Sequence, residues 1–201
     1  MTGSTEKRPF GRGEGFWNLP NSLTVLRIAL VPVMVVLLWD EPTLTETAIG
    51  FVVFVGAMLT DIVDGWLARR WNLTSPAGAY LDPMADKLMV TTVLVMMIPL
   101  GWVPAWLVVV LLCRELAITG LRGIASQEGM VLSASTLGKV KTAYQSTALG
   151  FILWNVETWG CEPKRTGLVL LYIATFFSLI SAAEYFISFF RQGGGQVKAA
   201  D

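Results

Sequence analysis

Four aspartates in one stretch of the chain have the spacing expected of a site for divalent cations. Asp61 and Asp64 are three residues apart, and Asp82 and Asp86 are four apart, so on helices each pair shares a face. Antiparallel packing of the two helices would bring four carboxylates together, and their mutual repulsion requires cations. Oxygen ligands without nearby nitrogen or sulfur suit Mg²⁺ or Mn²⁺ rather than zinc. The pattern therefore predicts a two-metal clamp of the kind that promotes phosphoryl transfer.

Small residues on the same helical face would let a nucleotide approach closely. Gly65 and Ala68 follow the first pair of aspartates at helical spacing. Each feature also has a plain structural interpretation: Asp82 precedes a proline and could be an N-cap, and Asp64 with Arg69 could be an interfacial ion pair. Gly65 and Ala68 could be an ordinary helix contact. These interpretations leave the coincidence of four acids at one membrane depth unexplained.

The composition favours a membrane protein over a soluble domain. Of the 201 residues, 54% are hydrophobic and 15% are charged, whereas soluble domains carry about 25% charged residues. The chain has no histidine, which excludes a Ser-His-Asp triad and histidine-ligated zinc. Two cysteines are too few for a disulfide framework. Zero net charge disfavours a nucleic-acid partner.

Six apolar runs predict an all-α bundle of six transmembrane helices. A bilayer span needs roughly 20 apolar residues, and the third run reaches that length only if its helix starts back near Asp82. Nearly all of the eight tryptophans lie close to the ends of the runs, as in an aromatic belt. The predicted spans are 23–39, 47–67, 87–100, 104–124, 140–159 and 168–190.

The distribution of basic residues predicts the orientation in the membrane. They gather on both tails and on the connections after the second and fourth spans, whereas the other connections are mainly acidic. The positive-inside rule then places both termini and the four aspartates on the cytoplasmic side. We expect a cytoplasmic juxtamembrane segment over 1–18, one membrane domain over 19–191 and a flexible tail over 192–201.

The aspartate motif also carries a resemblance to a known family. The pattern Asp-x2-Asp-Gly-x2-Ala-Arg-x8-Gly-x3-Asp-x3-Asp resembles the signature of the CDP-alcohol phosphatidyltransferases. The resemblance implies an integral membrane enzyme of six helices, commonly a homodimer, in which an alcohol hydroxyl displaces CMP from a CDP-linked substrate. The chain matches every specified position, at Asp61, Asp64, Gly65, Ala68, Arg69, Gly78, Asp82 and Asp86.

Site roles follow from this resemblance position by position. Asp61, Asp64 and Asp82 are similar to metal ligands, and Asp86 is similar to a ligand of the second metal that is also the general base. Two Mg²⁺ or Mn²⁺ ions are implied. The residues that resemble the donor-binding positions are Gly65, Ala68, Arg69, Ser75 and Gly78, with Asn21 and Thr24 in a nucleotide-contacting segment.

Cationic residues later in the chain predict a pocket for an anionic acceptor. Arg114 and Arg122 share one face of the fourth span, and a helix start at Lys139 also favours an anion. The alternative is that these residues only enforce topology, with Arg114 neutralised by Glu115 or Glu184. Lys139 and Lys141 lie about 200° apart on a helix, so we do not expect both to reach one site. The candidate acceptor residues are Arg114, Thr119, Arg122, Lys139 and Lys141.

The segments Arg-Glu-x4-Gly-Leu-Arg and Leu-Gly-Lys-x-Lys-Thr resemble those of bacterial phosphatidylglycerophosphate synthases within this family. The resemblance implies CDP-diacylglycerol as the donor, sn-glycerol 3-phosphate as the acceptor and the cell's inner, cytoplasmic membrane as the location. Two alternatives stay open. One is a cardiolipin or phosphatidylinositol-phosphate synthase that uses the same donor, and the other is a cation transporter with intramembrane carboxylates.

Overall fold

The computed structural model of the chain describes residues 19–71, 76–128, 136–156 and 162–197, and within these ranges it leaves out the side chains of 19–21, 64–69, 71, 76–83, 136 and 192–197. The described residues form six α-helices and no strand, which confirms the all-α prediction. The helices are α1 (Leu19–Leu37), α2 (Leu44–Trp71), α3 (Pro76–Met96), α4 (Ala105–Gln127), α5 (Thr136–Trp154) and α6 (Pro163–Val197).

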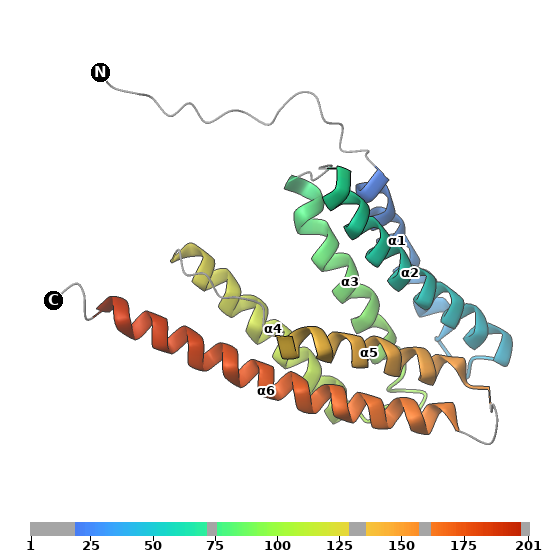
Figure 1. Ribbon diagram of the computed structural model, residues 1–201. Helices are drawn as coiled ribbons and strands as arrows, with labels where there is room; N and C mark the ends of the chain where they lie inside the picture. Colours follow the sequence, from blue (N-terminus) through green and yellow to red (C-terminus); the bar gives the residue numbers. More distant parts are fainter. Residues whose placement is uncertain (1–18, 72–75, 129–135, 157–161, 198–201) are drawn as a thin grey trace.

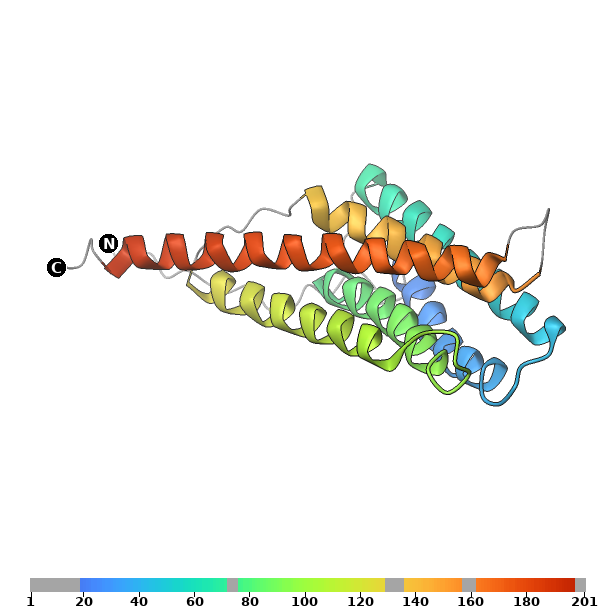
Figure 2. The same cartoon turned by 90° about the horizontal axis from the view of Figure 1, so that it is seen from below.

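The helices form two groups that meet along α5 (Figure 1). In one group α1 packs on both α2 and α3, and in the other α6 packs on both α4 and α5. Contacts between α2 and α5 join the groups. Figure 2 confirms that α4 and α6 run side by side for much of their length. Side chains from five of these helices can therefore converge where the two groups meet.

Local sequence signals explain several helix ends. Thr43 and Glu46 form a capping box at the start of α2: the Thr43 backbone N–H donates to Glu46 Oε2 over 2.7 Å, and the Glu46 N–H donates to Thr43 Oγ1 over 3.3 Å. After α3 the chain turns at Gly101, whose φ of +67° favours glycine. α4 then begins directly after Pro104. Proline lacks a backbone N–H, which is tolerated at the start of a helix but not in its interior.

Several helix boundaries depart from the sequence expectations, among them the start of α3 and the ends of α5 and α6. α3 begins at Pro76, ahead of Asp82, which supplies the additional length that the third predicted span required. α5 ends at Trp154, before the predicted end of its span at residue 159. α6 continues as a helix to Val197, past residue 192, where we expected a flexible tail to begin. The glycines in this last turn lower the helix propensity but do not block the backbone hydrogen-bond ladder.

Among the described residues, two helical segments are long and apolar enough to cross a membrane, Leu44–Val63 in α2 and Pro163–Arg191 in α6, and Ser22–Leu37 in α1 is a shorter apolar segment. Six spans were expected from the sequence. α4 carries three charged residues along its length, Arg114, Glu115 and Arg122. Each such residue lowers the mean hydropathy of its helix, whether or not its side chain faces lipid.

A continuous apolar core holds the two groups together. Its fully buried members come from α1, α2, α3, α4, α5 and α6 and include Met34, Phe54, Met89, Leu107 and Leu149. α5 and α6 approach closely at Gly167 on α6, where a Cβ atom would lie 2.6 Å from Ile152 Cγ1 and 2.7 Å from the Ala148 carbonyl oxygen. Only glycine permits that approach, which sets how closely α5 and α6 pack.

Candidate active site

A cavity of about 990 Å³ lies where α2, α3, α4, α5 and α6 converge. Its apolar side includes Met58, Ile62 and Leu94, and its polar side is rich in charged groups. Two of the predicted metal ligands and all of the predicted acceptor residues line this one cavity: Asp61, Asp86, Arg114, Thr119, Arg122, Lys139 and Lys141. Carboxylates, cations and an apolar wall therefore share one space.

The two described aspartates reach the cavity from adjacent helices. Asp61 lies on α2 and is 38% exposed, and Asp86 lies on α3 and is partly buried. The side chains of Asp64 and Asp82 are outside the described residues. Among the side chains that are described, no group of three histidine, cysteine, aspartate or glutamate residues is placed to hold a metal ion. Asp61 and Asp86 nevertheless have the oxygen donors that Mg²⁺ and Mn²⁺ prefer, so this half of the site fits a divalent cation.

Asp61 forms an ion pair with a residue that the sequence analysis did not select. Arg27 Nη1 on α1 lies 2.8 Å from Asp61 Oδ1, and the Arg27 side chain is 1% exposed. The signal was present in the sequence, because an arginine inside an apolar run is a functional candidate by default. Arg27 therefore holds the carboxylate of Asp61, one of the predicted metal ligands, in a fixed orientation from α1.

The predicted donor-binding residues are described only in part. Thr24 is completely buried on α1 and is not among the residues that line the cavity. The other predicted positions are outside the described residues, either as side chains or altogether: Asn21, Gly65, Ala68, Arg69, Ser75 and Gly78.

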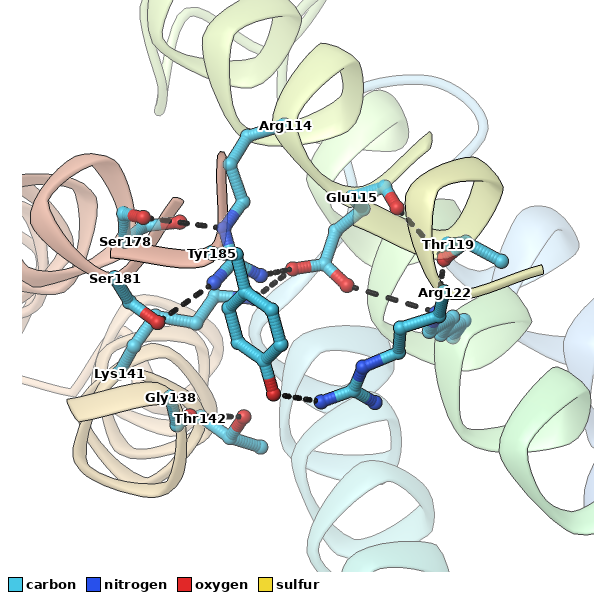
Figure 3. Close-up of polar contacts among 11 residues, drawn as sticks. Arg114, Glu115, Thr119, Arg122, Gly138, Lys141, Thr142, Ser178, Ser181 and Tyr185 are labelled. Atoms are coloured by element: carbon cyan, nitrogen blue, oxygen red, sulfur yellow. Dashed lines mark hydrogen bonds and ion pairs between the residues drawn. The ribbon is translucent and has the colours of Figure 1, made fainter. Parts of the chain in front are cut away.

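The basic residues that line the cavity form a cationic wall: Lys87, Arg114, Arg122, Lys139 and Lys141. The Glu115 carboxylate compensates the charges of Arg114 and Lys141, which are almost buried (Figure 3). Glu115 Oε1 accepts a hydrogen bond from Arg114 Nη1 over 2.8 Å and also pairs with Lys141 Nζ. The Arg114 and Lys141 side chains are 9% and 6% exposed. Glu115 is one of the two acids considered from the sequence as partners for Arg114, and it pairs with it. A carboxylate shared by both cations lowers the cost of burying their charges.

Lys87 links the aspartate side of the cavity to the cationic side. It follows Asp86 on α3, and its Nζ donates to Thr119 Oγ1 on α4 over 2.6 Å and lies 3.8 Å from Glu115 Oε2. Thr119 Oγ1 in turn donates to the Glu115 carbonyl oxygen over 2.7 Å. The sequence analysis did not identify Lys87 as a site residue, because its contacts are made with another helix.

Arg122 and the two lysines of α5 complete the cationic wall. Arg122 Nη2 donates to the Tyr185 hydroxyl on α6 over 2.5 Å. Lys139 is exposed whereas Lys141 is buried, yet both line the cavity, so the expectation that both would not reach one site is wrong. Gly138 and Thr142, on the same turns of α5, also line the cavity.

Comparison with known proteins agrees with the site. The family model described as CDP-alcohol phosphatidyltransferase matches residues 17–180. The chain belongs to the CDP-alcohol phosphatidyltransferase family. Members of this family generally use divalent metal ions, which agrees with the carboxylate donors contributed by Asp61 and Asp86.

Bacterial relatives in this family have similar length and a common name. A CDP-diacylglycerol--glycerol-3-phosphate 3-phosphatidyltransferase of Bacillus subtilis is 36% identical over 181 residues, which cover 85% of this chain and 94% of the relative. Proteins of the same name from Rickettsia bellii and Salmonella choleraesuis are 35% and 33% identical, each covering 84% of this chain and 93% of the relative.

Proposed function

We propose that this CDP-alcohol phosphatidyltransferase transfers the phosphatidyl group from CDP-diacylglycerol to sn-glycerol 3-phosphate, giving phosphatidylglycerophosphate and CMP. The observation that carries the proposal is the shared cavity: Asp86 lines it together with Lys87, Arg114 and Arg122. A neutral acceptor would not require so many cations, whereas a phosphomonoester does. The printed name of the relatives specifies the same donor and acceptor.

The donor is held at the aspartate side of the cavity. Asp61 and Asp86, with Asp64 and Asp82, would hold two Mg²⁺ or Mn²⁺ ions, which supply positive charge to the diphosphate of the donor. The apolar wall formed by Met58, Ile62 and Leu94 suits the acyl chains of a lipid. The positions that would hold the cytidine diphosphate are Gly65, Ala68, Arg69, Ser75 and Gly78, with Asn21 at the start of α1.

The acceptor is held at the cationic side and reacts at its primary hydroxyl. Arg114, Thr119, Arg122, Lys139 and Lys141 bind its phosphate, and Asp86 takes the hydroxyl proton. The hydroxyl oxygen forms a bond to the lipid-linked phosphorus, the bond from that phosphorus to the CMP oxygen breaks, and CMP leaves with the electron pair. Catalysis then depends on positioning and on electrostatic stabilisation of the developing charge.

We also propose a multi-pass location in the cytoplasmic membrane. All six helices would span the bilayer, with 1–18 and 192–201 flanking one membrane domain over 19–191. The end of α4 and the end of α6 lie toward the same side in Figure 1. Arg122 and Arg191 lie near these ends, and basic residues favour the cytoplasmic side. The site would then face the cytoplasm and its water-soluble acceptor, and the protein would act as a homodimer.

Acceptor competition tests the proposed function. Purified protein is incubated with CDP-diacylglycerol, Mg²⁺ and labelled glycerol 3-phosphate, phosphatidylglycerol or inositol phosphate, and CMP release and labelled lipid are measured with and without a chelator. We expect CMP release only with glycerol 3-phosphate and only without the chelator. Release with another acceptor would assign the chain to a different branch of the family. Cation flux in proteoliposomes without CMP release would indicate a transporter.

A further inference from the structure

Arg122 makes two different contacts with one tyrosine. Its Nη2 donates a hydrogen bond to the Tyr185 hydroxyl over 2.5 Å, and its Cζ lies 5.1 Å from the centroid of the Tyr185 ring (Figure 3). The first contact fixes the direction of the guanidinium group, and the second attracts it to the ring face. Both residues line the cavity.

Tyr185 is buried in a packed cluster, whereas the Arg122 side chain that it contacts is exposed. The Tyr185 side chain is 4% exposed and packs with Ile118, Leu121 and Ala182 in an apolar cluster between α4 and α6. Arg122 is exposed and belongs to a residue type with several rotatable bonds. An anion that binds a mobile arginine must immobilise it, which costs conformational entropy. A fixed tyrosine removes part of that cost before the anion arrives.

The same face of α6 also contacts the other arginine of α4. Arg114 Nε donates to the Ser178 carbonyl oxygen over 3.1 Å, and Arg114 Nη2 donates to Ser181 Oγ over 3.2 Å. Ser178, Ser181 and Tyr185 are three and four residues apart, so they share one helical face. The family model ends at residue 180, so Ser181 and Tyr185 lie beyond the positions that define the family match.

We propose that Tyr185 is a positioning residue that holds Arg122 in the orientation in which it binds the phosphate of the acceptor. The proposal rests on the proposed function, because it assumes that Arg122 faces an anionic acceptor. Tyr185 acts through Arg122, so its hydroxyl contributes to acceptor binding without touching the reacting atoms. Its removal therefore affects the KM for the acceptor and leaves the donor and the chemical step unchanged.

Tyr185→Phe tests this role, because it removes the hydroxyl and keeps the packed ring. We expect the KM for glycerol 3-phosphate to rise about five- to ten-fold, the scale of the net contribution of one ordinary hydrogen bond. The KM for CDP-diacylglycerol, the kcat and the thermal unfolding temperature should change little. Tyr172→Phe is the matched control on the same helix, since Tyr172 is exposed and packs against Trp106 away from the cavity.

A double-mutant cycle separates this inference from the proposed function. Arg122→Ala should raise the acceptor KM by at least ten-fold, and Tyr185→Phe should add nothing in that background. An unchanged acceptor KM in Tyr185→Phe, or an equal effect with and without Arg122, would overturn the positioning role while the proposed function stands. An Arg122→Ala variant with a normal acceptor KM would instead refute the anionic-acceptor assignment.

Discussion

Arg27 on α1 and Asp61 on α2 form an ion pair in which the arginine is almost completely buried and the aspartate faces the cavity. This geometry connects the core of the bundle to the candidate metal site. A buried guanidinium group needs a carboxylate close by, because an isolated charge is costly in an apolar interior. Asp61 provides it, and in return its carboxylate is held in one orientation at the cavity wall.

Replacement of Arg27 should therefore affect both folding and activity. We expect Arg27→Ala to lower the free energy of unfolding by about 1.5–3 kcal/mol, the range for hydrogen bonds to charged groups, and to reduce CMP release at least ten-fold. Thermal unfolding in detergent and a CMP assay measure the two effects. Arg165→Ala is the control, since Arg165 is exposed at the start of α6. Wild-type values for both quantities in Arg27→Ala would show that the ion pair is incidental.

Removal of the metal or of its ligands should abolish the reaction. Asp61→Asn and Asp86→Asn should each lower CMP release about 100-fold or more, because the amide neither binds a hard cation well nor accepts the hydroxyl proton. A chelator should have the same effect on the wild-type protein, and added Mg²⁺ should reverse it. Asp40→Asn, an exposed change in the α1–α2 connection, should have no effect. Full activity of the Asp61 and Asp86 variants in folded protein would contradict the metal site.

Glu115 and Lys141 should be energetically coupled. Glu115→Gln removes the carboxylate shared by Arg114 and Lys141, whose side chains are 9% and 6% exposed. The two cations then lie close together without a negative charge to compensate them. We expect this variant to unfold at a lower temperature. In a double-mutant cycle with Lys141→Met, the coupling free energy should be about 1–3 kcal/mol.

The control for this cycle is Glu162→Gln, an exposed change just before α6, which should leave the stability unchanged and show no coupling to Lys141→Met. Strictly additive effects of Glu115→Gln and Lys141→Met would mean that the ion pair does not stabilise the cationic wall.

The close approach of α5 and α6 should make Gly167 intolerant of a side chain. In Gly167→Ala the new Cβ would lie 2.6 Å from Ile152 Cγ1, so the helices must move apart, at a cost of about 1–3 kcal/mol for overpacking. Gly56→Ala is the matched control, because a Cβ at that helical position meets nothing within 4 Å. Thermal unfolding of the two variants compares them directly. Equal stability would show that the packing of α5 on α6 adjusts freely.

The sequence alone predicted what depends on spacing within one helix. The periodicity of three and four residues placed Asp61 with Asp64 and Arg114 with Arg122 on common faces, since 3.6 residues complete one helical turn. The apolar runs predicted six helices, and six are found among the described residues. The aspartate motif indicated the family to which the chain belongs. Each of these inferences depends only on residues that lie close together in the sequence.

Only the tertiary structure decided which residues meet across helices. Arg122 and Tyr185 are 63 positions apart, and no local pattern links them. The pairing of Glu115 with both Arg114 and Lys141, and the pairing of Arg27 with Asp61, likewise became evident only in the folded chain. The physical reason is that the rotation and crossing of packed helices follow from many side-chain contacts at once, including the approach at Gly167, whereas helical periodicity constrains a single element.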